Sequence, residues 1–421
     1  MIGRKFTLTP FRHRPDTSRS RPPRSLPQTE SCMRYAIVTE TYPPEINGVA
    51  LTVQGLEQGL RERGNAVQVV RPSQAGDATA TPFDNTLLVR GAGLPRYPGL
   101  RFGLPATRLL RRHWQGNRPD ALYVATEGPL GWSALRAARQ LGIPAATGFH
   151  TRFDAYMRDY GMPWLAPVAL RWMRHFHNSA QATLVPTREL QTLLEAEGFD
   201  NVVRLARAVD TGQFDPAHRD PVLRAMWGVG ERGVAAIFVG RIAAEKNLAL
   251  AVDAFRALQR QRPDARFVWV GDGPERDALQ RENPDFIFCG VQRGEALARH
   301  FASADLFVFP SHSETFGNVT LEALASGVPT VAFDYGAARE CLRDGLHGAA
   351  IPRTGQATQD DGAFIAAVMR IGSDEACRRR MRPLCREAVA ALRPAQVAAD
   401  FDHLLQSLAH RGHRHVPIAA L

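Results

Sequence analysis

The chain has 421 residues, of which 44% are hydrophobic and 22% charged, a composition typical of a soluble globular protein whose length predicts two domains. No apolar run reaches 18 residues, which argues against a membrane-spanning helix, and the five cysteines lack metal-site spacing, which indicates a reducing compartment and no cysteine chemistry. The net charge of +10 permits nucleic acid, anionic lipid or an acidic substrate as a partner, but no nucleic-acid-binding motif accompanies it.

Residues 1–32 contain seven Lys or Arg and two Asp or Glu, so half of the net charge lies in a segment rich in proline, serine and arginine. Such a composition cannot bury a core and predicts disorder, and the segment lacks the apolar stretch of a secretory signal. Two interpretations stay open. Either translation starts at Met33, or residues 1–32 form a mobile basic arm.

Short apolar runs alternate with helical patterns from Met33 onwards. The first series comprises Tyr35–Thr39, Ala66–Val70, Thr86–Val89, Ala121–Ala125, Ala145–Phe149 and Ala182–Val185. The second comprises Ala235–Val239, Phe267–Val270, Phe286–Cys289, Leu306–Phe309, Thr330–Phe333 and Ala349–Ile351. Apolar strands separated by helices predict parallel sheets covered on both faces, so two series predict an α/β protein with two Rossmann-like, doubly wound domains facing across a cleft.

The expected first domain is 33–205 and the second is 206–394, with the break in the turn-rich stretch near Val203–Arg219. A last helix, at about Ala395–His410, is expected to cross back, so that 395–421 forms a terminal helix and tail. Ligands of doubly wound sheets lie at the carboxyl ends of the strands, so residues directly after strands are the candidates for chemistry.

The turn after Ala235–Val239 reads G-R-I-A-A-E-K-N and contains Lys246, one of two lysines in a chain with fifty arginines. A strand, a turn at Gly240 and a helix start form a phosphate-binding geometry. Arg241 would offer a planar fork that grips two oxygens, and Lys246 a compact point charge. The alternative is that Lys246 is a surface lysine retained by chance.

The strand Leu306–Phe309 leads into S-H-S-E-T-F-G-N-V-T-L-E-A-L-A-S-G, which places Glu314 in a loop and Glu322 inside an apolar helix. Free amides near Gly317, at the start of that helix, suit a phosphate. A carboxylate on an apolar helix is costly unless it is hydrogen-bonded, and a ribose diol would satisfy it. The alternative for Glu322 is a buried ion pair with an arginine.

The pattern E-x7-E after a strand, with G-R-x4-K upstream, resembles the retaining nucleotide-sugar glycosyltransferases of the GT-B fold, and more narrowly family GT4 (the glycosyltransferase family 1 group). T-Y-P-P-E-I-N-G-V-A and G-F-H-T-R-F-D-A-Y extend the resemblance to bacterial mannosyltransferases that use GDP-mannose and lipid or polyprenyl-linked acceptors. It covers residues 33–410. The sequence departs from the family at Asn47 and Ala208, where relatives usually have glycine.

The resemblance implies that Arg241 and Lys246 hold the donor diphosphate, that Glu314 meets the sugar hydroxyls and that Glu322 binds the ribose. His150, in G-F-H-T, would lie near the donor sugar or the acceptor, or else cap a helix as a structural histidine. The further donor-binding positions that it implies are Asn47, Gly48, Gly240, Gly271, Asp272, Gly290, Val291, Phe316, Gly317 and Asn318.

Preorganised cations would stabilise the charge that develops on the leaving diphosphate. No Asp-x-Asp lies near the expected cleft, so neither an obligatory metal nor a cofactor beyond the donor is expected, and the resemblance implies retention of configuration. The expected activity is transfer of a hexose, foremost mannose from GDP-mannose, to a lipid-linked or saccharide acceptor. The alternatives are a UDP-sugar transferase of glycolipid or polysaccharide synthesis, a non-catalytic nucleotide- or nucleic-acid-binding protein, and an inactive transferase subunit.

Nucleic acid is not an expected partner. The expected location is the cytoplasm, with or without peripheral attachment to the inner face of the membrane. Arginines and aromatic residues are interleaved in Arg152–Ala180, and arginines cluster in Arg96–Arg118. Such surfaces suit an anionic membrane, but a helix pair packed on the first sheet and a solvated charged face explain them equally well.

Overall fold

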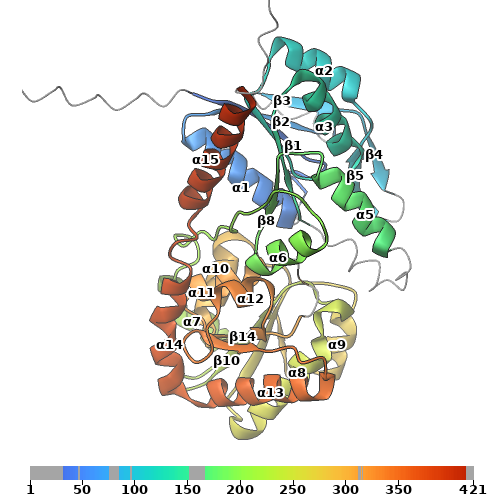
Figure 1. Cartoon of the computed structure of the whole chain (residues 1–421). Helices are drawn as coiled ribbons and strands as arrows, with labels where there is room; N and C mark the ends of the chain where they lie inside the picture. Colours follow the sequence, from blue (N-terminus) through green and yellow to red (C-terminus); the bar gives the residue numbers. More distant parts are fainter. Residues whose placement is uncertain are drawn as a thin grey trace, which may run out of the picture. The chain divides into compact units, whose positions relative to one another are not determined.

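The computed structural model of the chain describes residues 32–45, 48–74, 85–94, 97–150, 166–311, 314 and 316–413 (Figure 1). Both interpretations of residues 1–32 therefore concern a segment that, apart from Cys32, lies outside the described residues. The same holds for Asn47, for Arg96 and for the aromatic residues between 151 and 165. The described part of the chain is organised around two parallel sheets that are covered by helices. The two sheets pack into separate hydrophobic cores.

The first sheet has seven parallel strands in the order β3-β2-β1-β6-β7-β8-β9, so that successive strands are added outward on one side from β1 and on the other side from β6. The strands are β1 (Arg34–Val38), β2 (Ala66–Pro72), β3 (Thr86–Val89), β6 (Ala121–Val124), β7 (Ala145–Gly148), β8 (Ala182–Val185) and β9 (Val202–Arg204). The helices of this part are α1 (Gly48–Glu62), α2 (Thr107–Gly116), α3 (Pro129–Leu141), α5 (Ala166–His177) and α6 (Arg188–Ala196).

Alternation along β1 explains why this sheet is covered on both faces. Tyr35 and Ile37 point into a core shared with α1 and with the last helix, α15 (Pro394–His413). Ala36 and Val38 point into the opposite core, which α2, α3 and α5 complete. Successive strand residues face opposite sides of a sheet, so an all-apolar strand requires a cover on each side.

The second sheet has six parallel strands in the order β12-β11-β10-β13-β14-β15. They are β10 (Ala235–Val239), β11 (Arg266–Val270), β12 (Ile287–Phe288), β13 (Leu306–Phe309), β14 (Thr330–Phe333) and β15 (Gly348–Ile351). The helical elements are η2 (Pro216–His218), α7 (Pro221–Met226), η3 (Ala244–Lys246), α8 (Leu248–Gln261), α9 (Arg276–Glu282), α10 (Gly294–Ser303), α11 (Asn318–Ala325), α12 (Gly336–Cys341), α13 (Ala357–Ser373) and α14 (Glu375–Ala388).

All twelve predicted strands are present, and three more were not predicted. β9 was missed because it has only three residues, of which Val203 and Arg204 are exposed. The glycine-rich antiparallel pair β4 (Gly91–Leu94) and β5 (Tyr97–Gly103) carries too few β-forming residues to be recognised. The last helix packs on the first sheet, where the Tyr35 hydroxyl donates a hydrogen bond to Asp402 over 2.7 Å. No helix among the described residues is long and apolar enough to cross a membrane.

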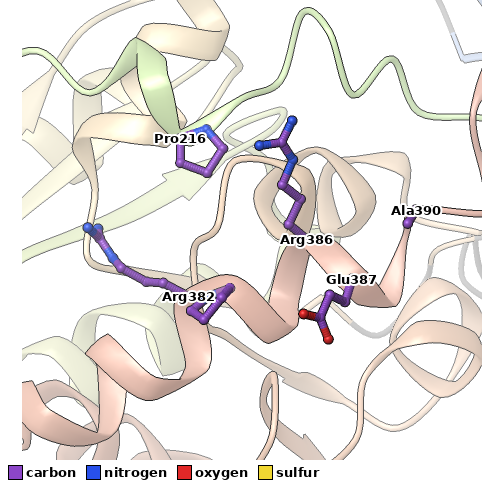
Figure 2. Close-up of a pocket in the computed structure, with 6 residues that line it drawn as sticks. Pro216, Arg382, Arg386, Glu387 and Ala390 are labelled. Atoms are coloured by element: carbon purple, nitrogen blue, oxygen red, sulfur yellow. The ribbon is translucent and has the colours of Figure 1, made fainter.

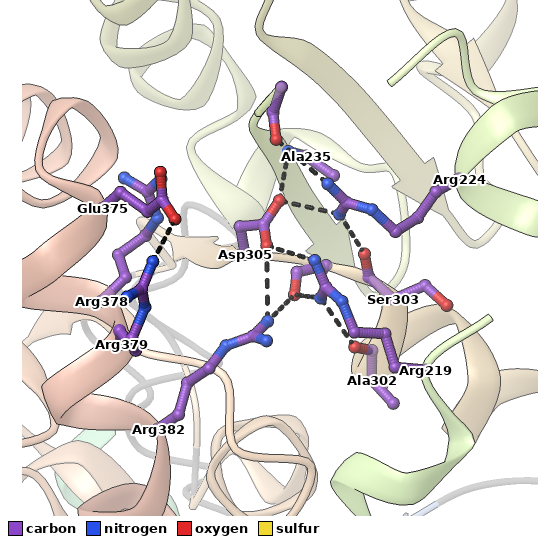
Figure 3. A network of polar contacts seen from close by, with 12 residues as sticks. Arg219, Arg224, Ala235, Ala302, Ser303, Asp305, Glu375, Arg378, Arg379 and Arg382 are labelled. Atoms are coloured by element: carbon purple, nitrogen blue, oxygen red, sulfur yellow. Dashed lines mark hydrogen bonds and ion pairs between the residues drawn. The ribbon is translucent and has the colours of Figure 1, made fainter. Parts of the chain in front are cut away.

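A buried polar cluster ties β10 to β13 at the ends of these strands remote from their carboxyl edge (Figure 3). Asp305, just before β13, accepts hydrogen bonds from Arg219 (2.7 Å), from Arg224 (2.8 Å) and from the Ala235 amide that opens β10 (2.9 Å). Arg382, from α14, approaches to 3.4 Å. Burial opposes ionisation of Asp305, yet the guanidiniums of Arg219 and Arg224 hold its pKa below the usual value. The cluster therefore fixes the two strands whose carboxyl ends carry the predicted site.

Candidate functional site

The strand order of the second sheet makes the edge between β10 and β13 the candidate ligand site. The chain runs outward in one direction from β10 through β11 to β12, and in the other through β13 and β14 to β15. In open parallel sheets, ligands lie at the carboxyl ends of the strands where the order reverses, because the loops there diverge to opposite faces. The loops concerned are Gly240–Lys246, after β10, and the segment from Pro310 to Gly317, after β13.

These two loops meet through Lys246 and Glu314. The Lys246 ammonium forms a short ion pair with the Glu314 carboxylate, and both side chains are largely buried, with exposed fractions of 16% and 19%. The Ser311 hydroxyl donates to the same carboxylate oxygen over 3.0 Å. Two of the predicted site residues, 68 positions apart in sequence, thus form one polar group at the reversal point of the sheet.

Tyr335, which the sequence analysis did not single out, supports this group. It follows β14, and its hydroxyl donates to the Ser311 carbonyl over 2.8 Å while accepting a hydrogen bond from the Glu314 amide over 3.2 Å. A residue directly after a predicted strand meets the criterion used for the other candidates. Tyr335 could therefore have been found as a neighbour of the site, although not by its contacts.

Glycines at the carboxyl edge allow the loops after β10 and β11 to pack directly on one another. Gly271 has φ +139°, and a Cβ there would lie 1.9 Å from the Gly240 carbonyl oxygen. A Cβ on Gly273 would lie 2.2 Å from the Ile242 carbonyl oxygen. The Gly271 amide donates to the carbonyl of Gly290, which follows β12. Only residues without a Cβ fit at 271 and 273, so the V-G-D-G-P turn is dictated by backbone contact.

The remaining predicted residues of the second sheet lie on the same edge with different exposure. Arg241 is 64% exposed, and its guanidinium lies 3.7 Å from Glu245, so it is accessible to a ligand. Asp272 pairs with Arg276 at 3.3 Å. Val291 is 54% exposed beside Gly290.

The helix that carries Glu322 begins at a residue in the left-handed conformation. Gly317 has φ +88° and precedes Asn318, the first residue of α11, while Phe316 is buried against the core. The first turn of α11 contains no acidic side chain and no side-chain cap, and its Thr320 amide donates to the Gly317 carbonyl over 3.0 Å.

Glu322 is the least satisfied acidic side chain of this group. Its Oε2 is buried without a hydrogen-bond partner, and burial raises the pKa of its carboxyl to about 7. No ion pair with an arginine is found for Glu322 in the part of the chain that the structure describes. The sequence had left that ion pair open as an explanation. A carboxylate kept without a partner on an apolar helix is instead suited to a ligand that brings hydrogen-bond donors.

His150 and Gly48 belong to the first sheet. Gly48 is the exposed first residue of α1, directly after Asn47, which is not described. His150 follows β7 and is buried, with Nδ1 at 2.5 Å from the Arg207 guanidinium and Nε2 at 2.9 Å from the Tyr123 hydroxyl. Because a guanidinium only donates, Nδ1 accepts and Nε2 carries the proton. Burial and the Arg207 charge hold the pKa of His150 well below its usual value, so the imidazole is neutral and both its nitrogens are engaged within the chain.

The reversal point of the first sheet carries two carboxylates that the sequence analysis missed, of which Glu127 is buried and Glu40 is partly buried. Glu40, after β1, accepts a hydrogen bond from the Leu130 amide at the start of α3, and burial raises its pKa to about 7. Glu127, after β6, lies 3.4 Å from the buried His177 ring. T-E-T-Y and T-E-G-P follow predicted strands, so position alone could have flagged both residues.

A hollow of about 530 Å³ on the second sheet's part of the chain lies elsewhere (Figure 2). It is lined by Pro216 and by residues of α14 and its end, namely Arg382, Pro383, Arg386, Glu387 and Ala390. None of the predicted site residues contributes to it. Within the described residues, no group of three or more His, Cys, Asp or Glu side chains is arranged to hold a metal ion.

Comparison with known proteins identifies the family of the chain. Residues 46–213 match the family model "Glycosyltransferase Family 4", and residues 233–374 match "Glycosyl transferases group 1". The chain is 36% identical to a GDP-mannose-dependent alpha-mannosyltransferase of Mycolicibacterium smegmatis, over 85% of this chain and 93% of the relative. Identity to the enzyme of the same description from Mycobacterium tuberculosis is also 36%, over 76% and 84% of the two chains. Sucrose-phosphate synthase from Thermosynechococcus elongatus superimposes with a TM-score of 0.72 at 19% identity, covering 90% of this chain and all of the other.

Proposed function

The chain belongs to the family 4 glycosyltransferases, with the GT-B fold of two parallel-sheet α/β domains, and we propose that it transfers mannose from GDP-mannose to a lipid-linked or saccharide acceptor. The glycosyltransferase activity follows from the family. The donor, the acceptor and the stereochemistry are the proposal. Two relatives at 36% identity, both described as GDP-mannose-dependent, support mannose over the UDP-sugars.

The observation that carries the proposal is the set formed by Lys246, Glu314 and Glu322 at the reversal point of the second sheet. A sugar nucleotide presents sugar hydroxyls, a diphosphate and a ribose diol, with the diphosphate between the two sugars. Lys246 and the exposed Arg241 offer cations for the diphosphate, Glu314 an acceptor for the sugar hydroxyls, and Glu322 an unpartnered acceptor for the ribose. Each of these three parts of the ligand therefore has at least one matching side chain in the candidate site.

The chemistry follows from where charge develops. As the bond between the sugar and the diphosphate breaks, negative charge grows on the diphosphate, and cations already in place stabilise it without reorganisation. Lys246 is held in position by Glu314, which must exchange this ion pair for contacts with the incoming donor. We assign diphosphate stabilisation to Lys246 and Arg241 acting without an obligatory divalent ion, and we propose that the anomeric configuration is retained.

The acceptor side is assigned to the first sheet, and a membrane surface is proposed as its partner. On α2, Leu109 is 47% exposed and is flanked by the exposed Arg108, Arg111 and Arg112. On α5, Trp172 is 43% exposed, and its ring contacts Trp132 of α3, which itself packs beside α2. Apolar side chains surrounded by arginines suit the interface of an anionic bilayer. Co-sedimentation with vesicles tests this: binding to anionic but not to zwitterionic vesicles is expected, and equal recovery with both would refute it.

The test of the donor is a binding and product analysis of the chain starting at Met33. GDP and GDP-mannose are expected to stabilise the protein, by about 2.7 kcal/mol at a hundredfold their dissociation constants, whereas UDP-glucose and ADP are not. Turnover with GDP-mannose is expected to persist in EDTA, and the first-formed product, followed by NMR, is expected to keep the α-configuration.

A response to UDP-sugars alone would keep the site and replace the donor, which is the second candidate function. A response to no nucleotide at all would overturn the site. Retention of the chain on DNA at physiological salt would instead favour the nucleic-acid-binding alternative.

A further inference from the structure

The turn between β14 and α12 lies against the loop that carries Glu314. Tyr335 contacts this loop twice, at the Ser311 carbonyl and at the Glu314 amide. Two residues further on, the Ala337 amide donates to the Phe316 carbonyl over 2.7 Å. Three backbone groups of the loop are therefore hydrogen-bonded to the segment that directly follows the neighbouring strand β14.

The glycine between these two residues shows how closely the turn approaches. Gly336 has φ +56°, and a Cβ at that position would lie 2.6 Å from the Phe316 carbonyl oxygen. Backbone atoms cannot move away as a flexible side chain would, so this approach excludes any other residue without displacement of the loop. The contact is a second, independent sign that the turn and the loop are fitted to each other.

The Tyr335 ring is itself held in place. The Arg353 guanidinium lies over the ring, 5.5 Å from its centroid. Such a cation–π contact fixes the plane of the ring and with it the direction of the hydroxyl. Burial, followed by the nearby Glu314 charge, raises the pKa of Tyr335 above its usual value, so the hydroxyl keeps the proton that it donates to Ser311.

We propose that Tyr335 is a positioning residue for Glu314, and that the segment from Tyr335 to Ala337 fixes the conformation of the loop between β13 and α11. The hydroxyl holds the loop backbone at two points, the Ser311 carbonyl and the Glu314 amide. With its backbone fixed, Glu314 presents its carboxylate to Lys246 and, when a donor is bound, to the sugar. We call the contacts of Tyr335, Gly336 and Ala337 with this loop the clamp. The inference rests on the proposed function for its ligand, but the clamp itself is a property of the chain alone.

A positioning role is assigned because different side chains of the site would bind different parts of the donor. In the proposed function, Lys246, Arg241 and Glu322 bind the nucleotide part of the donor, whereas Glu314 is assigned to the sugar. Loosening the loop should therefore weaken recognition of the sugar and spare recognition of the nucleotide. A tyrosine with a merely structural role would change both together, or neither.

The test compares Tyr335→Phe with Tyr35→Phe, which removes a buried tyrosine hydroxyl bound to Asp402 on the first sheet. In hydrogen exchange, the peptide spanning residues 306–317 is expected to exchange faster in Tyr335→Phe and unchanged in Tyr35→Phe. The kcat/KM for GDP-mannose is expected to fall about tenfold in Tyr335→Phe, the effect of one or two lost hydrogen bonds, while the Kd for GDP changes less than about twofold.

Unchanged exchange in that peptide would overturn the clamp whatever the ligand. Faster exchange with equal losses for GDP and GDP-mannose would overturn the positioning role. If the wild-type protein binds neither ligand, the proposed function is wrong, and the exchange result still decides on the clamp. Gly336→Ala provides a second variant that perturbs the same contact without removing the hydroxyl, and it is expected to accelerate exchange in the same peptide.

Discussion

Replacing Glu322 with glutamine is expected to make the protein more stable and less able to bind nucleotide. The carboxyl is buried, its Oε2 has no hydrogen-bond partner, and burial raises its pKa from an ordinary 4.5 to about 7. That difference corresponds to roughly 3 kcal/mol by which the ionised carboxylate destabilises the folded chain. Because Glu322 keeps some access to solvent, the expected gain for Glu322→Gln is about 1–3 kcal/mol at pH 8.

The sign of the pH dependence follows from the same values. Above pH 7 the carboxylate is charged in both the folded and the unfolded chain, so the full cost is present and glutamine removes it. Below pH 4.5 the group is protonated in both states and the cost vanishes. The stability advantage of Glu322→Gln is therefore expected at pH 8 and should be largely lost by pH 5.

The assay is urea unfolding of both proteins at the two pH values, with Glu282→Gln on α9 as the control, since Glu282 is exposed. In parallel, calorimetric titration with GDP is expected to show affinity lowered about 10- to 100-fold in Glu322→Gln, the value of charge-assisted hydrogen bonds to the ribose. A variant that is no more stable at pH 8, or that binds GDP as well as the wild type, would refute this reasoning.

Three further outcomes are expected. GDP binding should release a proton below pH 7, because the ribose favours ionised Glu322; titrations in buffers of different ionisation enthalpy would show it, and none released would contradict the assignment. Lys246→Ala should lower kcat at least a hundredfold with an unchanged circular dichroism spectrum, and near-normal turnover would remove Lys246 from the site. Asp305→Ala should cost about 3–5 kcal/mol in urea unfolding, because it leaves the buried Arg224 and its neighbour Arg219 unpaired; a loss below about 1 kcal/mol would show that other groups satisfy these arginines.

The sequence was sufficient to predict twelve of the described strands and to place Lys246 and Glu314 after strands, at the carboxyl edge of one sheet. Both follow from one rule: buried parallel strands are continuous apolar runs, and residues just after neighbouring strands share an edge. Lys246 and Glu314 follow β10 and β13, which pair directly. Tyr335 obeys the same rule but carries no charge, so nothing in its residue type indicated chemistry.

The sequence could not predict contacts that depend on side-chain reach and register. The partners of His150 are Arg207, on the connector after β9, and Tyr123, on β6, and neither follows from the G-F-H-T motif. For Glu322 the sequence allowed an arginine partner or a ligand, since both satisfy a carboxylate. Only the geometry, in which Oε2 is left without a partner, separates them.

The site of the unliganded chain combines a satisfied pair with an unsatisfied group, and this combination has a consequence for selectivity. Lys246 and Glu314 neutralise each other, so a bare diphosphate that takes Lys246 leaves the largely buried Glu314 carboxylate without a cation, with the Ser311 hydroxyl still donating to it. In the proposed binding mode, a sugar diphosphate would supply hydroxyls to Glu314 in the same event, and the nucleoside would supply them to Glu322. The ion pair would then penalise partial ligands, because only a complete sugar nucleotide would satisfy every group that it displaces.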